Sequence, residues 1–197
     1  EQPAITARHL DVTAGEENGT TTQQLSMAYG PGNAREFLPA DMNVSGIQFS
    51  PDGRMVSFMW ADGDDKKAVW GIPVDGGAQR KLAHVEGAAV RSYAWSPDGS
   101  HMHLLVAAEE DKDRTAQSKA GFNSVVYEEE PQFNRLFRAR IGMEPDAEPQ
   151  EVSLPGYVTS FQIADDARTG VIETAPTTLI DDEYVNKKVN ILDMESG

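Results

Sequence analysis

The chain contains no cysteine. This excludes a disulfide framework, a thiolate nucleophile and a zinc site built on cysteine. No apolar run approaches the roughly 18 to 20 residues that cross a bilayer, and no signal-type segment opens the chain, so we expect no membrane association. The first residue is Glu1, which favours a processed protein or a piece of a longer one. We expect a periplasmic or secreted location, with the cytoplasm as the alternative.

Basic residues are scarce, with 17 Lys and Arg against 32 Asp and Glu and a formal net charge of -15. Such a balance repels phosphate backbones, so nucleic acid is excluded as a partner. Acidity of this size mainly keeps a protein in solution, and attraction for cationic peptides or amines is the weaker alternative. The hydrophobic share of 39% and charged share of 25% predict a folded globular chain.

An internal repeat is the strongest signal in the sequence. Residues 47–54 read Ile-Gln-Phe-Ser-Pro-Asp-Gly-Arg, and residues 93–100 read Tyr-Ala-Trp-Ser-Pro-Asp-Gly-Ser. A third copy at residues 161–168 keeps the apolar alternation and the acidic turn but has lost Pro and Gly. Repeats at this spacing indicate an array of similar supersecondary units.

Each copy predicts a β-hairpin. In Ser-Pro-Asp-Gly, proline presets φ, aspartate bonds nearby amides and glycine accepts a positive φ, which together favour a tight turn. Val56, Phe58 and Trp60 then follow the two-residue period of a strand with one buried face. Leu104 and Val106 follow the same pattern in the second copy.

Each of the first two hairpins is followed by a third strand, then by a turn-rich stretch and a short fourth strand. We expect third strands at 69–74, 136–141 and 189–194, and fourth strands near 80–83 and 151–154. Four short antiparallel strands repeated in this way indicate propeller blades rather than a sandwich. The predicted fold is therefore all-β, a partial β-propeller of about three four-stranded antiparallel blades.

The expected blades span residues 44–89, 90–156 and 157–197. The second is longer than the first because of an insertion at about 109–134, which opens with the charge run Glu-Glu-Asp-Lys-Asp. Residues 1–43 form an N-terminal segment that we interpret as an incomplete blade. Within this segment we expect a polar loop at Thr20 to Gln24 and short strands at 25–29 and 35–38. Residues 1–19 are expected to form a tail or a strand that closes the ring.

The apolar-x-apolar-Ser-Pro-Asp-Gly units at 47–53 and 93–99 resemble the repeats of TolB and of the propeller domains in the prolyl oligopeptidase family of serine peptidases. The resemblance covers roughly residues 44–194. In the peptidases, the propeller restricts access to the active site and helps to recognise substrate, while Ser, Asp and His lie in a separate α/β-hydrolase domain. The resemblance implies that such a domain belongs to the parent protein and is missing here.

The segment Val126-Tyr127-Glu128-Glu129-Glu130 resembles a Tyr-Glu-Glu-Glu stretch in the dipeptidyl peptidase IV branch of that family. There a glutamate pair holds the free amino terminus of the peptide. Residue by residue, the resemblance implies that Glu129 and Glu130 bind substrate. Two carboxylates converging on an ammonium make charge-assisted hydrogen bonds and fix which peptide bond reaches the nucleophile. The alternative is a solvated acidic face, because Pro131 departs from the family pattern.

No catalytic residue is expected in the chain, because it has no Gly-x-Ser-x-Gly nucleophile elbow. His101 and His103 fall on one face of a predicted strand and could share a metal, but no further ligands are evident, so we predict no metal site and no cofactor. We expect Trp60, Trp70 and Trp95 to pack between blades.

Two functions remain open at this point. The first is the propeller portion of a prolyl oligopeptidase-like peptidase that gates access and binds peptide. The second is a TolB-like periplasmic propeller that binds a protein partner. Three blades leave open flanks, so self-association through those flanks is also expected.

Overall fold

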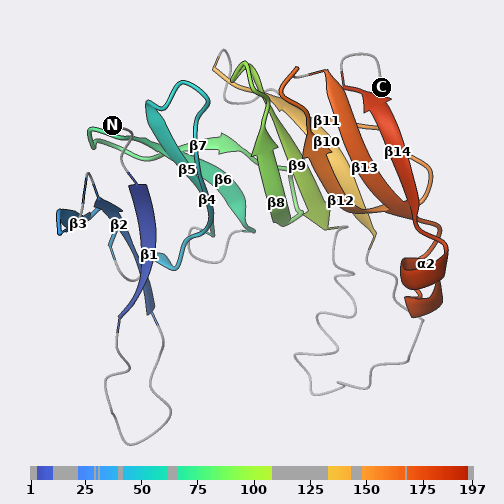
Figure 1. Cartoon of the computed structure of the whole chain (residues 1–197), viewed down its shortest axis with the longest axis horizontal. Coiled ribbons are helices and arrows are strands. Elements are labelled where there is room, and N and C mark those ends of the chain that lie inside the picture. The colour runs from blue at the N-terminus through green and yellow to red at the C-terminus, as the bar shows by residue number, and fades with distance from the viewer. Residues whose placement is uncertain are drawn as a thin grey trace, which may run out of the picture. The chain divides into compact units, whose positions relative to one another are not determined.

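The computed structural model describes residues 4–10, 22–28, 30, 32–39, 42–61, 66–107, 133–142, 148–166 and 168–194. The regular secondary structure of the described residues is almost entirely β-strand. It divides into two compact units, the first covering Glu1–Trp60 with Trp70–Arg80 and the second Ala61–Val69 with Lys81–Gly197. Figure 1 shows the elements along the chain.

The first unit contains a three-stranded sheet with order β1-β2-β3. Its strands are β1 (Ala4–Leu10), β2 (Thr22–Ala28) and β3 (Ala34–Glu36). Thr22 to Gln24, expected as loop, pair with Leu10 to Arg8 on β1. The loop prediction was wrong because cross-strand pairing outweighs the weak strand propensity of a polar run.

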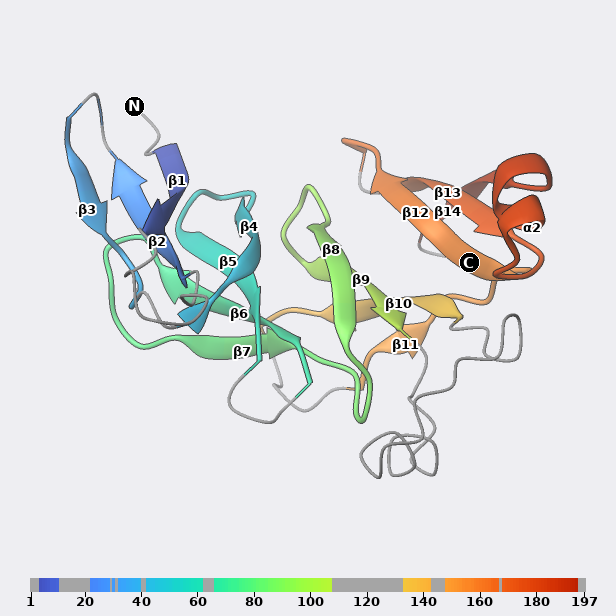
Figure 2. The same cartoon turned by 90° about the horizontal axis from the view of Figure 1, so that it is seen from below.

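The next sheet has the order β4-β5-β6-β7 and follows the first Ser-Pro-Asp-Gly repeat. Its strands are β4 (Ser45–Phe49), β5 (Met55–Trp60), β6 (Ala68–Pro73) and β7 (Arg80–Ala83). The residues packed between it and the first sheet form one core, and the strands of both sheets are labelled in Figure 2. Its buried members are Leu25, Met27, Leu38, Val44, Val56, Phe58 and Ile72.

Trp60 and Trp70 pack against this core and contact one another edge to face, with ring centroids 5.1 Å apart. Their predicted packing role is confirmed. Trp95 is half-buried at the end of its strand.

The second unit holds two sheets. The first has the order β11-β10-β9-β8, from β8 (Val90–Trp95), β9 (His101–Ala107), β10 (Asn134–Arg140) and β11 (Gln150–Glu151). The second has the order β12-β13-β14, from β12 (Tyr157–Ile163), β13 (Thr169–Ala175) and β14 (Lys188–Asp193). A short helix α2 (Ile180–Val185), absent from the sequence-based expectations, connects β13 to β14.

These two sheets lie face to face (Figures 1 and 2) around a second core. Its buried members are Leu105, Leu136, Val158, Ile172 and Met194. All the sheets in the described residues are antiparallel wherever a register is given, and two of them have four strands. The predicted all-β fold of antiparallel propeller blades is confirmed, with two four-stranded and two three-stranded sheets among the described residues.

The Ser-Pro-Asp-Gly turns fold as their composition predicts. Ser96 Oγ accepts the His101 N–H at 2.9 Å and donates to Asp98 Oδ1 at 2.5 Å. Gly99 has φ +71°, which a residue with a Cβ rarely adopts. Ser50, Asp52 and Gly53 repeat this arrangement in the first copy.

The eroded third copy keeps only the aspartate. Asp166 Oδ1 accepts the N–H groups of Arg168 and Thr169 at 2.9 and 2.8 Å. Each turn closes on the same backbone bond, so Met55, His101 and Thr169 are equivalent positions: the amides of Ser50, Ser96 and Ala164 donate to their carbonyls. This alignment allows the blades to be compared residue by residue.

Candidate functional site

The candidate site lies in the second unit, at the end of the sheets where β10 and β12 begin. Glu129 and Glu130, the predicted substrate-binding pair, lie outside the described residues. The described chain resumes at Phe133, whose ring meets that of Tyr157 edge to face at 6.2 Å between centroids. Phe133 thus lies beside Tyr157, the first residue of β12.

A cavity of about 320 Å³ opens at this position. Phe133, Leu136, Leu154 and Val158 contribute apolar walls. Across it, an Arg135 guanidinium nitrogen lies 3.2 and 3.3 Å from the two carboxylate oxygens of Glu151. Both side chains are more than two-fifths exposed, so the pair keeps the guanidinium accessible and adds little stability.

Arg135 also lines a second cavity, of about 370 Å³, together with the apolar residues Val85, Val106 and Phe137. Arg135 thus lines both cavities. An arginine fork offers several N–H donors to carbonyl or carboxylate groups.

Gly156 sets the approach of the chain to Tyr157. It has φ +80°, and a Cβ placed there would lie 2.2 Å from the carbonyl oxygen of Ala175. No side chain fits in that gap, so glycine is required for β12 to start directly beside the end of β13.

Tyr157 connects this end of the sheet to α2. Its side chain is buried, and its hydroxyl donates to a Glu183 carboxylate oxygen on the helix. Burial, with the neighbouring Glu183 and Asp182 charges, raises the pKa of Tyr157 above its usual range. The phenol therefore stays neutral and acts as a donor that fixes the helix.

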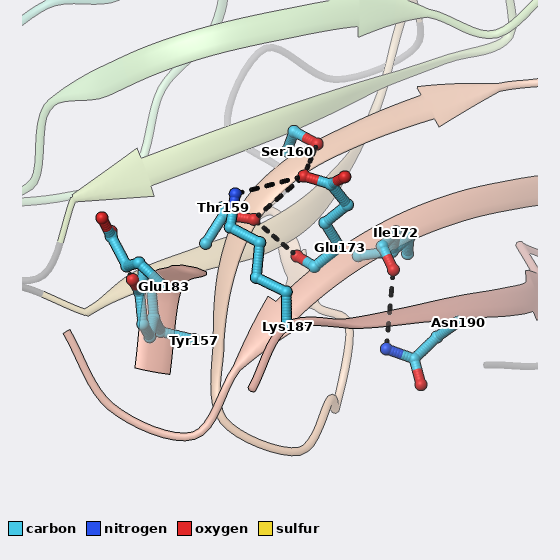
Figure 3. Close-up of polar contacts among 8 residues, drawn as sticks. All are labelled: Tyr157, Thr159, Ser160, Ile172, Glu173, Glu183, Lys187 and Asn190. Atoms are coloured by element: carbon cyan, nitrogen blue, oxygen red, sulfur yellow. Dashed lines mark hydrogen bonds and ion pairs between the residues drawn. The ribbon is translucent and has the colours of Figure 1, made fainter. Parts of the chain in front are cut away.

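Glu173 on β13 is the centre of a second polar group, drawn in Figure 3. Its carboxylate accepts from Ser160 Oγ at 2.9 Å and lies 3.6 Å from Lys187 Nζ. The hydrogen bond from Ser160, assisted by the Lys187 charge, lowers the pKa of Glu173. Asn190 adds a bond from its amide to Thr174 Oγ1 at 2.9 Å.

The acidic side chains described here are held by neighbouring donors. Glu151 pairs with Arg135, and Glu173 pairs with Lys187. Glu183 accepts a hydrogen bond from the hydroxyl of Tyr157. The hydroxyl of Ser160 donates to a carboxylate, whereas a nucleophilic serine donates to a general base such as imidazole. The described residues supply an apolar hollow with one cationic fork, and the acidic pair Glu129 and Glu130 remains a prediction.

The two strand histidines are placed on one face of β9 as predicted. His103 pairs across the strands with Ala94 on β8 and with Arg138 on β10. Within the described residues, no group of three or more His, Asp and Glu side chains could hold a metal ion. Nor does any described helix have the length and apolar character to span a membrane.

Sequence reasoning missed Tyr157, Gly156 and helix α2. A Pro-Gly-Tyr run at 155–157 is a turn signal that could have marked the bend before β12. The helix had a weaker signal, an acidic run at 181–183 without a capping residue at Leu179.

These features define the class of the chain: it is built from β-propeller blades. No family model matches it, and no curated protein matches its sequence. Solved structures do share its fold. A TolB from Agrobacterium tumefaciens is 18% identical with a TM-score of 0.57, covering 98% of this chain and 59% of that one.

Solved structures of peptidases also share the fold of this chain. The acylaminoacyl peptidase of Pyrococcus horikoshii is 13% identical with a TM-score of 0.63, over 98% of this chain and 30% of that chain. A prolyl endopeptidase structure is 14% identical with a TM-score of 0.57, over 96% of this chain and 28% of that one. The chain thus has the fold of TolB-type and prolyl oligopeptidase-type propellers, and spans less than two thirds of each of these proteins.

Proposed function

We propose that the chain is a non-catalytic propeller portion of a prolyl oligopeptidase-like serine peptidase, where it gates access and binds the amino terminus of peptide substrates. The likeness to the acylaminoacyl peptidase and the prolyl endopeptidases supports the peptidase setting. The observation that carries the binding role is the position of Phe133. It ends the connection that contains Glu129 and Glu130, and it lines the cavity beside Arg135 and Glu151.

The proposed chemistry divides recognition between charge and shape. Glu129 and Glu130 would accept hydrogen bonds from the substrate ammonium, each charge-assisted bond contributing about 1.5 to 3 kcal/mol. The apolar wall of the cavity would contact a substrate side chain near the amino terminus. The Arg135 guanidinium would donate a hydrogen bond to a backbone carbonyl of the substrate. Holding the amine fixes the distance from the terminus to the cleaved bond, so binding becomes exopeptidase specificity.

The test uses the natural full-length protein and compares kcat/KM for one peptide with a free and an acetylated amino terminus. Replacing both residues (Glu129→Gln, Glu130→Gln) should lower kcat/KM for the free peptide by at least about tenfold, since about 1.4 kcal/mol is a factor of ten. Cleavage of the acetylated peptide should not change. A control with Glu109→Gln and Glu110→Gln removes the same charge from the same connection and should leave both rates intact. Equal effects of the two double variants would refute a specific amine site.

The alternative function is a TolB-like propeller that binds a protein partner in the periplasm. The likeness to the Agrobacterium TolB, 59% of whose chain is covered, favours it. A fluorophosphonate probe that labels active-site serines separates the two functions. Labelling of the natural protein is expected for the peptidase, and a natural protein that is not labelled but retains a specific partner would support the TolB-like alternative.

A further inference from the structure

A basic cluster lies between the two sheets of the second unit, away from the cavity described above. His103 on β9 faces Arg138 on β10, and the next pair toward the Ser-Pro-Asp-Gly turn is His101 with Arg140. Because side chains alternate along a strand, these four share a face with Leu105 and Leu136. Those two leucines pack against β12, β13 and β14 in the second core, so the cluster lies on the face that stacks on the third blade.

Its central polar groups are buried and have no hydrogen-bond partner among the described residues. His103 is 1% exposed, and within the described part of the chain neither ring nitrogen is hydrogen-bonded. Arg138 Nε is also buried and unbonded there, while its Nη2 lies 3.5 Å from His101 Nδ1. Leaving a buried donor unpaired destabilises a fold, and more strongly when the donor is charged.

Apolar side chains of the third blade pack in the core on the same face, among them Val158, Phe161 and Ile172. Asp98 is the carboxylate whose charge acts on both histidines, and it is already held by Ser96 and Ser100. The cluster is therefore locally cationic in a chain whose net charge is -15.

The turn alignment places other residues at the equivalent positions of the neighbouring sheets. Ser57 is equivalent to His103 after the first repeat and is fully buried. Val171 and Ile191 are equivalent to His103 and Arg138 after the third repeat and are 40% and 77% exposed. Burial of imidazole and guanidinium at these positions is therefore a feature of the second sheet, and buried polar groups without partners among the described residues point to a bound group.

We propose that Arg138, His103 and His101 form a binding site for a small anion, chloride or a carboxylate group, between the second and third blades. The Arg138 guanidinium supplies the charge and an Nε–H donor. His103 stays neutral near pH 7, because burial and Arg138 lower its pKa to about 4, and contributes one ring N–H. The anion satisfies donors that the protein leaves unpaired, and it neutralises the guanidinium.

The test titrates the 197-residue chain with sodium chloride and, separately, sodium acetate, at ionic strength held constant with a bulky sulfonate buffer salt. The Arg138 Nε–H and the His103 ring signals are followed by NMR, and thermal unfolding is measured in parallel. The chain has 4 histidines, so His84 serves as an internal exposed reference. Saturable shifts of the Arg138 and His103 signals are expected, with Tm rising by about 3 °C at ten times the dissociation constant.

Two variants separate binding from structure. In Arg138→Met the anion-dependent shift of His103 and the rise in Tm should be lost, whereas Arg140→Met, which removes a charge at the rim, should keep both. A response to chloride alone or to acetate alone identifies the anion. No saturable shift in the wild type, or an equal rise in Tm in Arg138→Met, would overturn the site; if Arg138→Met fails to fold, the wild-type titration decides.

Discussion

Leu136 and Val189 occupy equivalent positions in successive blades but opposite environments, which gives a sharp test of blade stacking. Leu136 pairs with Leu105 on the neighbouring strand, and Val189 pairs with Glu173 at the matching place in the third sheet. Leu136 is 0% exposed inside the second core, whereas Val189 is 65% exposed. Truncation to alanine should therefore have very different consequences at the two sites.

Leu136→Ala removes apolar volume from a packed interface and leaves a cavity, which costs about 2 to 5 kcal/mol. Val189→Ala changes an exposed side chain and should cost less than about 0.5 kcal/mol. With a Tm change of about 2 to 4 °C per kcal/mol for a domain of this size, Leu136→Ala should lower Tm by about 10 °C.

Urea unfolding followed by tryptophan fluorescence, at low protein concentration, measures both variants against the wild type. A control at Leu105→Ala, the cross-strand partner of Leu136, should behave like Leu136→Ala. If Leu136→Ala and Val189→Ala lowered the free energy of unfolding equally, the claim that the face with Leu136 is packed and the face with Val189 is exposed would be refuted. A neutral Leu136→Ala would refute the core itself.

Three further predictions follow from the described contacts. Hydrogen bonds from Ser100 and Ser96 lower the pKa of Asp98 to about 2. The stabilising effect of the Asp98 carboxylate is therefore present above the unfolded pKa near 4 and is lost as pH falls toward 2. The Tm difference between the wild type and Asp98→Asn should shrink over that pH range, and a constant difference would contradict this. Burial lowers the pKa of His103 to about 4, so stability should fall by up to about 3 kcal/mol as pH drops from about 6.5 to 4. In low salt, His103→Leu should remove that part of the acid sensitivity, measured by urea unfolding at each pH, and an unchanged pH dependence would contradict this. The exposed face with Val171, Val189 and Ile191 should drive weak self-association, visible as a concentration-dependent mass in light scattering; Val189→Lys with Ile191→Lys should abolish it, and a strictly monomeric wild type would count against it.

The sequence was informative where chemistry is local. Ser50, Asp52 and Gly53 determine a turn by themselves, because their hydrogen bonds and φ values involve only the next few residues. The repeat then located most strands within one or two residues, although the fourth strand expected at 151–154 is only Gln150–Glu151. Long-range effects were harder to predict: polar Thr22 to Gln24 become strand only because Leu10 to Arg8 pair with them.

The candidate site was predictable only in part. The Glu-Glu-Glu run drew attention to the connection before Phe133, but nothing local shows that Phe133 meets Tyr157 or that Arg135 reaches Glu151. The buried pair of His103 and Arg138 was hidden for a similar reason. Alternation suggested one buried face on β9, whereas its residues are buried on both, and a histidine in that setting reads as a surface residue until the stacked sheet is known.

Peptide binding by the 197-residue chain tests the central claim most directly. Fluorescence anisotropy of a short labelled peptide, free or acetylated at its amino terminus, gives two dissociation constants under the same conditions. The proposed amine site predicts at least about tenfold weaker binding after acetylation, and loss of that preference in the Glu129→Gln, Glu130→Gln variant. Equal affinity for the two peptides in the wild type would contradict recognition of the amino terminus by these blades.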